Sequence, residues 1–158
     1  MTGIKHVDKI MDISSLLSPD LILCRHNSSS KKRILEDVAE HISEQYPDLD
    51  TNMVFSALIA REKLGSTGIG GGIAIPHCRI PQCSNTIGML ITLTNSIEFN
   101  AIDSQEVDII FVLLVPEDAN DNHLQTLASI AETFSDNETL EQMRKANSVD
   151  ELLTILKQ

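Results

Sequence analysis

A histidine in the middle of this chain follows a glycine-rich segment and a short apolar run. The sequence from Arg61 to Arg79 is REKLGSTGIGGGIAIPHCR, and the histidine in it is His77. Glycines can adopt positive φ and leave backbone N–H groups uncovered, so these groups could converge on an anion such as a phosphoryl group. Neutral imidazole keeps a lone pair near pH 7 and is a competent nucleophile. The segment therefore predicts a phosphorylatable histidine, and an ordinary flexible connection beside a surface histidine remains the alternative.

The glycine-rich segment does not match the two common nucleotide-binding motifs. The Walker A motif requires lysine and then serine or threonine after its second glycine, where this chain has Gly71 and Gly72. The dinucleotide motif requires a third glycine where this chain has Ile73, and it follows a strand instead of preceding one. We therefore expect phosphoryl binding without a nucleotide. The residues expected to form this phosphoryl-binding loop are Gly65, Ser66, Thr67, Gly68, Gly70, Gly71 and Gly72.

Arg61 stands at the entrance to this loop. In a loose phosphoryl-transfer transition state, the protein mainly positions groups and stabilises charge on the equatorial oxygens, a task that suits a guanidinium. Arg61 is therefore the candidate for charge stabilisation. A solvated arginine in the last turn of a helix, where the helix dipole favours a cation, remains the alternative.

Metal and cysteine chemistry are disfavoured around the histidine. Cys78 and Cys83 lie near His77 in sequence, but a structural zinc site needs four ligands and the chain has no further ligand pair at zinc-site spacing. Neighbours in an extended segment point to opposite faces, so His77 could not easily act as a base for Cys78. The G-x-S-x-G motif of serine hydrolases is absent from the sequence. We expect neither a metal nor a cofactor.

The sequence LGSTGIGGGIAIPH resembles the active-site sequence of the fructose/mannitol-type IIA proteins of the bacterial phosphotransferase system, especially their nitrogen-regulatory branch. The resemblance continues through ISSLLSPDLILC and SSSKKRILEDVAEHISE upstream and AIDSQEVDIIFVLLVPEDANDNHLQTLASIAE downstream, so it covers most of the chain. It implies that residues 13–158 form an EIIA type-2 domain after a flexible lead at residues 1–12. The family commonly has asparagine in place of Gly71 and glycine in place of Cys78.

The resemblance implies roles for three side chains. His77 would accept a phosphoryl group on Nε2 from a phosphorylated HPr-like carrier, while a backbone carbonyl holds the other ring nitrogen. Arg61 and His123 would line the same site as partners of the phosphoryl group and the histidine. His123 is expected in the first turn of a helix, whose N-terminus favours anions, although an exposed histidine is the alternative on the pattern alone. Cys78 is expected to have an extended or helical backbone, with its thiol either buried or open to oxidation.

Two outputs are compatible with a phosphorylated histidine at this position. In the first, phosphorylation changes the binding of regulatory protein targets by adding negative charge. In the second, the phosphoryl group passes to a IIB domain and then to a sugar of the fructose or mannitol type. The nitrogen-type upstream sequence and the lack of an attached IIB or IIC segment favour regulation, and transfer to a IIB domain remains the alternative.

Composition predicts a single compact domain with protein partners. The chain has 158 residues, of which 42% are hydrophobic, and its formal net charge is −11. This charge would be repelled by nucleic acid and by an anionic membrane surface, so neither is an expected partner. The chain contains neither an apolar run long enough to span a bilayer nor the apolar core of a signal peptide, which predicts a cytoplasmic protein without membrane insertion. An odd count of three cysteines fits reduced thiols there.

The elements that must position the site alternate between helices and strands. We expect a three-layer α/β sandwich, in which helices cover both faces of a mixed sheet. The run at 107–115 is apolar nearly throughout and predicts a central strand covered on both faces, whereas 97–99 predicts a weaker edge strand. Pro76 is expected to end the ladder of a short strand at 73–75. The other expected strands are 21–24 and 86–94, and the expected helical segments are 13–17, 31–45, 51–63, 122–134, 138–146 and 149–157.

Overall fold

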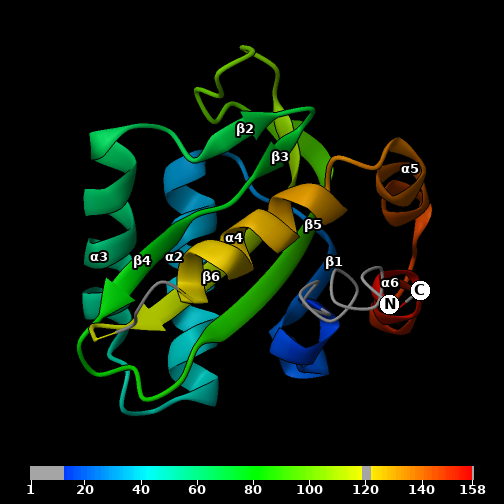
Figure 1. Cartoon of the computed structure of the whole chain (residues 1–158). Coiled ribbons are helices and arrows are strands. Elements are labelled where there is room, and N and C mark those ends of the chain that lie inside the picture. Colours follow the sequence, from blue (N-terminus) through cyan, green and yellow to red (C-terminus); the bar gives the residue numbers. More distant parts are fainter. Residues whose placement is uncertain (1–12, 119–121, 158) are drawn as a thin grey trace.

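The protein is built on a mixed sheet of six strands, shown in Figure 1. The computed structural model describes residues 13–118 and 122–157 of the chain. The sheet order is β1-β5-β6-β3-β2, and β4 also pairs with β6. The β5–β6 and β2–β3 pairs are antiparallel and the other pairs are parallel. The strands are β1 (Ile22–His26), β2 (Gly68–Gly70), β3 (Ile73–Ala74), β4 (His77–Ile80), β5 (Ile87–Ile97) and β6 (Val107–Pro116).

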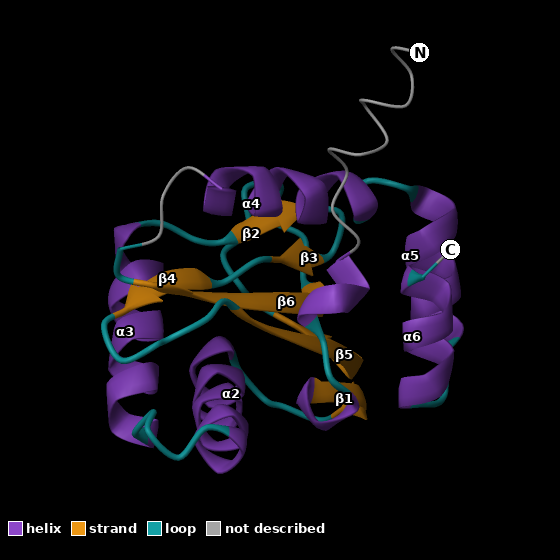
Figure 2. Cartoon of the chain, turned by 60° about the horizontal axis from the view of Figure 1, so that its bottom comes forward, coloured by secondary structure: helices purple, strands orange, loops and turns teal. Residues whose placement is uncertain are grey.

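Helices cover both faces of the sheet, as the sequence predicts. In Figure 2, α2 and α3 lie under one face, α4 lies over the other, and α5 and α6 stand beside the β1 edge. No helix among the described residues is both long and apolar enough to cross a membrane. The helices are α2 (Lys31–Gln45), α3 (Thr51–Leu64), α4 (Asn122–Thr133), α5 (Asn137–Lys145) and α6 (Val149–Leu156), with short 3₁₀ turns η1 (Ile13–Leu16) and η2 (Pro19–Leu21).

Strand β6 divides its side chains between two hydrophobic cores. Ile110, Val112 and Leu114 belong to the core under α2 and α3. Ile109 and Leu113, together with Phe111, belong to the core on the α4 side. Because side chains alternate along a strand, a strand buried on both faces has to be apolar at every position. This confirms the prediction of a central strand covered on both sides.

Capping residues set the ends of the helices near the site. The hydroxyl of Ser30 accepts a hydrogen bond from the N–H of Arg33, and α2 has the predicted bounds. The carboxylate of Asp50 accepts from the N–H of Met53 at the start of α3, and Gly65 follows its end. Side-chain caps satisfy N–H groups that the first helical turn leaves without partners. Because α3 ends at Leu64, Arg61 lies in its last turn, directly before the glycine-rich segment.

The outer strands differ from the sequence-based predictions. Pro76 does not end the ladder, because β4 resumes at His77 and both β3 and β4 pair with β6 in one continuous register. Proline removes a single donor, which interrupts the pairing without ending it. The predicted edge strand at 97–99 is wrong as a separate element, since β5 runs on to Ile97 across a register shift. Strand β2 lies within the glycine-rich segment and has no counterpart among the predicted strands.

Candidate functional site

His77 begins β4, immediately after the interruption at Pro76. Its side chain is half-buried, and its Nδ1 lies 2.7 Å from the carbonyl oxygen of Ile75. A carbonyl oxygen can only accept, so Nδ1 carries the proton in this contact. In the neutral ring the lone pair is then on Nε2, which is the nitrogen that can act as a nucleophile. The local backbone therefore selects one tautomer of His77.

His77 and Arg61 line the same pocket, which has a volume of about 450 Å³. Arg61 comes from the last turn of α3, and its Nη1 donates to the carbonyl oxygen of Gly65 at 2.9 Å. The pocket combines an imidazole, two guanidinium groups and apolar side chains. Such a site is suited to an anion, because the guanidinium cations attract it and the low polarity of the surroundings strengthens that attraction. The residues that line the pocket are Ala60, Arg61, Leu64, His77, Cys78, Arg79, Leu113 and Val115.

Arg79 is a pocket residue that the sequence analysis does not single out. It lies two positions after His77 in β4, and its Nη1 donates to the carbonyl oxygen of Glu117 at 3.0 Å. Residues two apart on a strand share a face. That spacing is the signal that could have found Arg79, once His77 is known to lie in a strand.

Four backbone N–H groups of the glycine-rich segment have hydrogen-bond acceptors within the protein. The N–H groups of Thr67, Gly68 and Gly71 donate to the side chains of Glu62, Ser66 and Asp103. The N–H of Gly65 donates to the carbonyl oxygen of Glu62. A folded loop pairs its own backbone groups where side-chain acceptors are near, so these four donors are already engaged within the protein. The binding of a phosphoryl group by the predicted loop stays a prediction.

The far end of this segment also lies away from the histidine. Gly70, Gly71 and Gly72 form the tip of the β2–β3 hairpin, and Ile73 pairs with Ile109 while His77 pairs with Leu113. Four residues along a strand span about 13 Å. The structure thus brings the Gly65–Thr67 end of the predicted loop near the pocket and places the three consecutive glycines at the other end of the strand.

A buried ion pair fastens the Gly65–Thr67 end of the segment. The carboxylate of Glu62 accepts from the N–H and the hydroxyl of Thr67, and Lys31 Nζ lies 3.0 Å from Glu62 Oε2. The Glu62 side chain is only 5% exposed. Within REKL this glutamate looks like one more exposed charge, so the sequence analysis misses it. Its importance depends on burial, which the local sequence does not show.

Cys78 has an extended backbone, one of the two conformations that the sequence predicts, and its thiol is partly buried. Burial raises the pKa of this thiol from 9.0 to about 12, with a further contribution from Cys83 and a smaller opposing one from Arg61. A thiol with so high a pKa is protonated near neutral pH and is a poor nucleophile. Among the described residues, no group of three or more histidine, cysteine, aspartate or glutamate side chains could hold a metal ion.

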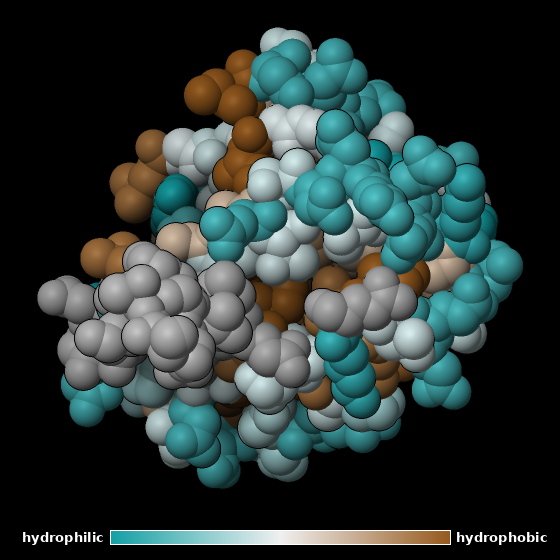
Figure 3. All heavy atoms as spheres, turned by 45° about the vertical axis from the view of Figure 1, so that its right-hand side comes forward, coloured by the Kyte–Doolittle hydropathy of each residue, from teal (hydrophilic) through white to brown (hydrophobic). Residues whose placement is uncertain are grey.

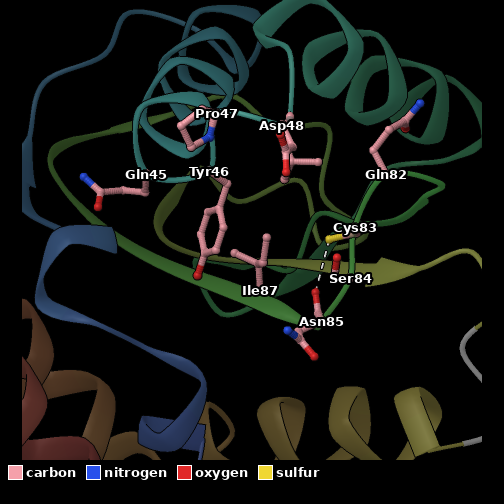
Figure 4. A pocket seen from close by; sticks show the side chains of 10 residues that line it. Gln45, Tyr46, Pro47, Asp48, Gln82, Cys83, Ser84, Asn85 and Ile87 are labelled. Carbon is pink, nitrogen blue, oxygen red and sulfur yellow. Dashed lines mark hydrogen bonds between the residues drawn. The ribbon is translucent and has the colours of Figure 1, made fainter.

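A second pocket, of about 260 Å³, lies between the α2–α3 connection and the turn after β4, and Figure 4 shows its lining. It shares no residue with the His77 pocket. Its one cysteine, Cys83, donates its S–H to the carbonyl oxygen of Asn85 at 3.2 Å, and burial raises the pKa of the thiol. A protonated, hydrogen-bonded thiol is a poor nucleophile. The His77 pocket, which combines an imidazole with two arginines, is the candidate site.

Helix α4 begins at Asn122, as the sequence predicts, so His123 lies in its first turn. The side chain of His123 lies outside the described part of the chain. Its predicted role beside His77 stays a prediction.

The family model described as "Phosphoenolpyruvate-dependent sugar phosphotransferase system, EIIA 2" matches residues 15–158. A nitrogen regulatory protein from Pseudomonas aeruginosa is 40% identical over 144 residues, which cover 91% of this chain and 94% of that protein. The crystal structure of nitrogen regulatory protein IIA-Ntr from Neisseria meningitidis has a TM-score of 0.85 at 37% identity and covers 91% of this chain and 98% of its own.

The fold is also similar to that of enzyme IIA mannitol from Escherichia coli, in a complex with phosphorylated enzyme IIB mannitol. That likeness has a TM-score of 0.73 at 19% identity and covers 89% of this chain and 96% of that one. At this identity it supports the architecture alone. The family match and the nitrogen regulatory relatives together show that the chain belongs to the EIIA type-2 family of the phosphoenolpyruvate-dependent sugar phosphotransferase system.

Proposed function

We propose that the protein is a phosphocarrier that accepts a phosphoryl group on Nε2 of His77 from the phosphohistidine of an HPr-like carrier. The observation that carries the proposal is the contact of 2.7 Å between Nδ1 of His77 and the Ile75 carbonyl oxygen. It leaves the lone pair of the neutral ring on Nε2, in a pocket that Arg61 also lines. In the transfer, Nε2 forms a new N–P bond while the N–P bond of the donor breaks, and the donor imidazole keeps that electron pair.

Arg61 stabilises the transferred group in this proposal. The three equatorial oxygens share negative charge in the transition state, and a guanidinium already placed near them needs no reorganisation. His123 is assigned by the family resemblance as a second partner of the phosphoryl group, at the helix N-terminus where anions are favoured. In this proposal, the Gly65–Thr67 end of the glycine-rich segment holds Arg61 and His77 in position.

The output that we propose is regulation of protein targets by the phosphorylation state of His77. Proteins named nitrogen regulatory protein are the relatives that support it. A phosphoryl group adds close to two negative charges and three acceptor oxygens, enough to change which protein surfaces bind the pocket. The alternative is transfer to a IIB domain, which membership of a sugar phosphotransferase family supports.

Reconstitution with labelled phosphoenolpyruvate, enzyme I and an HPr-like carrier tests the phosphoryl transfer. The wild type is expected to take up label and His77→Ala to take up none. His41→Ala is the matched control, because His41 lies on α2, where its Nδ1 contacts the Asp37 carbonyl oxygen, outside the pocket lining. An unlabelled wild type, or a fully labelled His77→Ala, contradicts the proposal.

The two outputs separate in a second experiment. If the protein regulates, binding partners recovered with His77→Asp differ from those recovered with His77→Ala, since only the former carries negative charge at the site. If it takes part in transport, label on the wild type moves to a purified IIB domain. Rapid and complete transfer to IIB, with identical partners for both variants, would replace the regulatory output with the transport one.

A further inference from the structure

Glu62 is a buried residue close to the His77 pocket, but it is not among the residues that line that pocket. Glu62 is 9% exposed and lies next to Arg61 in α3. We infer that Glu62 is a positioning residue that sets the orientation of both the His77 imidazole and the Arg61 guanidinium. This inference rests on the proposed function for its kinetic consequences, whereas its effect on the imidazole can be measured without any transfer.

The first connection runs from the Glu62 side chain to the imidazole. The N–H of Thr67 donates to Glu62 Oε1 at 3.2 Å and its hydroxyl donates to the same oxygen. The carbonyl oxygen of Thr67 accepts from the N–H of Ile75 at 3.0 Å. The carbonyl oxygen of Ile75 accepts from Nδ1–H of His77 at 2.7 Å. Three successive contacts thus lead from a buried carboxylate to the ring nitrogen that fixes the tautomer.

The second connection runs from the Glu62 backbone to the guanidinium. The carbonyl oxygen of Glu62 accepts from the N–H of Gly65 at 3.1 Å. The carbonyl oxygen of Gly65 in turn accepts from Nη1 of Arg61 at 2.9 Å. Holding Thr67 therefore also holds Gly65, since only Ser66 separates them. One anchored residue in this way controls the positions of His77 and Arg61, which both line the pocket.

Lys31 is what allows a carboxylate to serve as this anchor. Its Nζ lies 3.0 Å from Glu62 Oε2 and 4.9 Å from the centre of the Phe99 ring. A buried carboxylate without a cation is strongly unfavourable, whereas a paired one can accept several hydrogen bonds at once. The carbonyl oxygen of Phe99 also accepts from the hydroxyl of Ser66 at 2.7 Å, which ties the loop to the same place.

If Glu62 only stabilised the fold, its hydrogen-bonded contacts would not need to lead to a ring nitrogen of His77. If Thr67 moves, the Ile75 carbonyl moves with it and the Nδ1–H contact weakens, so the proton can shift to Nε2 and remove the nucleophilic lone pair. A displacement of about 1 Å in a reacting group can lower a rate by about 100-fold. Loss of the Glu62 anchor is therefore expected to alter the tautomer and the rate together.

Glu62→Gln tests the inference with almost no change in size. The amide has one acceptor oxygen and an NH₂ group, so it cannot accept from both Lys31 and the two donors of Thr67. The ¹⁵N shifts of the His77 ring report the tautomer in the full chain, and labelled transfer reports the rate. We expect the share of the Nδ1–H tautomer to fall and the transfer rate to drop at least tenfold, with donor affinity unchanged.

Asp37→Asn is the matched control for this variant. Asp37 is also 9% exposed, but its carboxylate pairs with His26 and Arg33 instead of Thr67. This variant is expected to lose stability while the His77 tautomer and the transfer rate stay those of the wild type. If Glu62→Gln and Asp37→Asn have the same effect on the tautomer, the positioning role is wrong.

Thr67 provides a second test should Glu62→Gln fail to fold. Thr67→Val keeps the shape and the N–H but loses the hydroxyl, whereas Thr67→Ser keeps both donors. The tautomer is expected to shift in Thr67→Val and to return in Thr67→Ser. An unchanged tautomer in Thr67→Val overturns the inference. A wild type that takes up no phosphoryl group would instead contradict the proposed function and leave the tautomer measurement to decide the positioning role.

Discussion

At His77, a neighbouring carbonyl oxygen decides which ring nitrogen is available for chemistry. The Ile75 carbonyl oxygen accepts a hydrogen bond from Nδ1–H, which keeps the proton on Nδ1, and the residues Ile-Pro-His place the two groups within two positions of each other. Sequence analysis finds His77 and Arg61, since their side chains carry recognisable chemistry. It misses Glu62 and Arg79, since their significance depends on burial and on strand position.

Replacing Arg61 with alanine should slow transfer without unfolding the protein. Loss of one preorganised donor to a charged transition state typically lowers the rate by roughly 100-fold. Lys63→Ala is the control, because Lys63 is exposed in the same helical turn and lies outside the pocket. The measurements are labelled transfer and thermal unfolding. A large loss of thermal stability in Arg61→Ala would show that Arg61 is mainly structural.

The Cys78 thiol should resist alkylation in the folded protein. Burial holds its pKa at about 12, so the thiolate is scarce at neutral and mildly basic pH. Because the folded pKa is raised above the unfolded value of 9.0, its contribution to stability is full below that pH and is lost as the pH rises towards about 12. Mass spectrometry of iodoacetamide-treated protein, with and without urea, measures the rate of Cys78 alkylation in the unfolded and the folded protein. Equal rates in both samples would contradict it.

Among the elements, the β2–β3 hairpin is tied to α5 through one arginine. Arg144 donates to both carboxylate oxygens of Asp108, at 2.8 and 3.0 Å, and to the carbonyl oxygen of Gly71 at 2.8 Å. Sequence analysis could not predict β2, because glycines lack the side chains that give a strand its alternating pattern. It predicts α2 within its observed bounds, because Ser30 and the apolar spacing are local signals.

Alanine at Gly72 should destabilise the hairpin more than alanine at Gly71. Both glycines have positive φ, so each substitution costs about 1 kcal/mol in backbone strain. A Cβ at Gly72 would also lie 2.5 Å from Nη2 of Arg144, whereas a Cβ at Gly71 meets nothing within 4 Å. Displacing the charged contacts of Arg144 adds about 2 kcal/mol.

Urea denaturation of the single variants and of Gly72→Ala combined with Arg144→Ala measures this difference. In the Arg144→Ala background, the extra penalty at Gly72 should shrink, because the guanidinium is gone and the remaining close neighbour is Asp108 Oδ1, at 2.9 Å from the added Cβ. Equal destabilisation by Gly71→Ala and Gly72→Ala would show that the Arg144 side chain moves aside without lowering the free energy of unfolding.

Across the whole molecule, a strongly negative protein presents a pocket lined by two arginines. On the face that carries α5 and α6, hydrophilic side chains predominate and apolar atoms form separate spots (Figure 3). The three-layer architecture follows from the sequence because apolar runs and helical spacing extend over many residues. The sequence does not predict that β3 and β4 form one interrupted strand, since this depends on pairing with β6, which is distant in the sequence.

Transfer from the HPr-like carrier should slow as ionic strength rises. The net charge of −11 attracts a donor with a basic docking face over long range, and salt screens charges beyond about 8 Å under physiological conditions. Initial rates of labelled transfer at increasing sodium chloride measure this, with the single-turnover rate at saturating donor as the control. A rate independent of salt would mean that encounter is not steered by charge.

The most direct measurement of the central claim is the position of the phosphoryl group on the phosphorylated protein. Heteronuclear NMR that correlates ³¹P with the imidazole nitrogens can assign it in the full chain. The account predicts a single phosphohistidine, at Nε2 of His77, with Nδ1–H still donating to the Ile75 carbonyl oxygen. A phosphoryl group on Nδ1 of His77, or on any other residue, would contradict it.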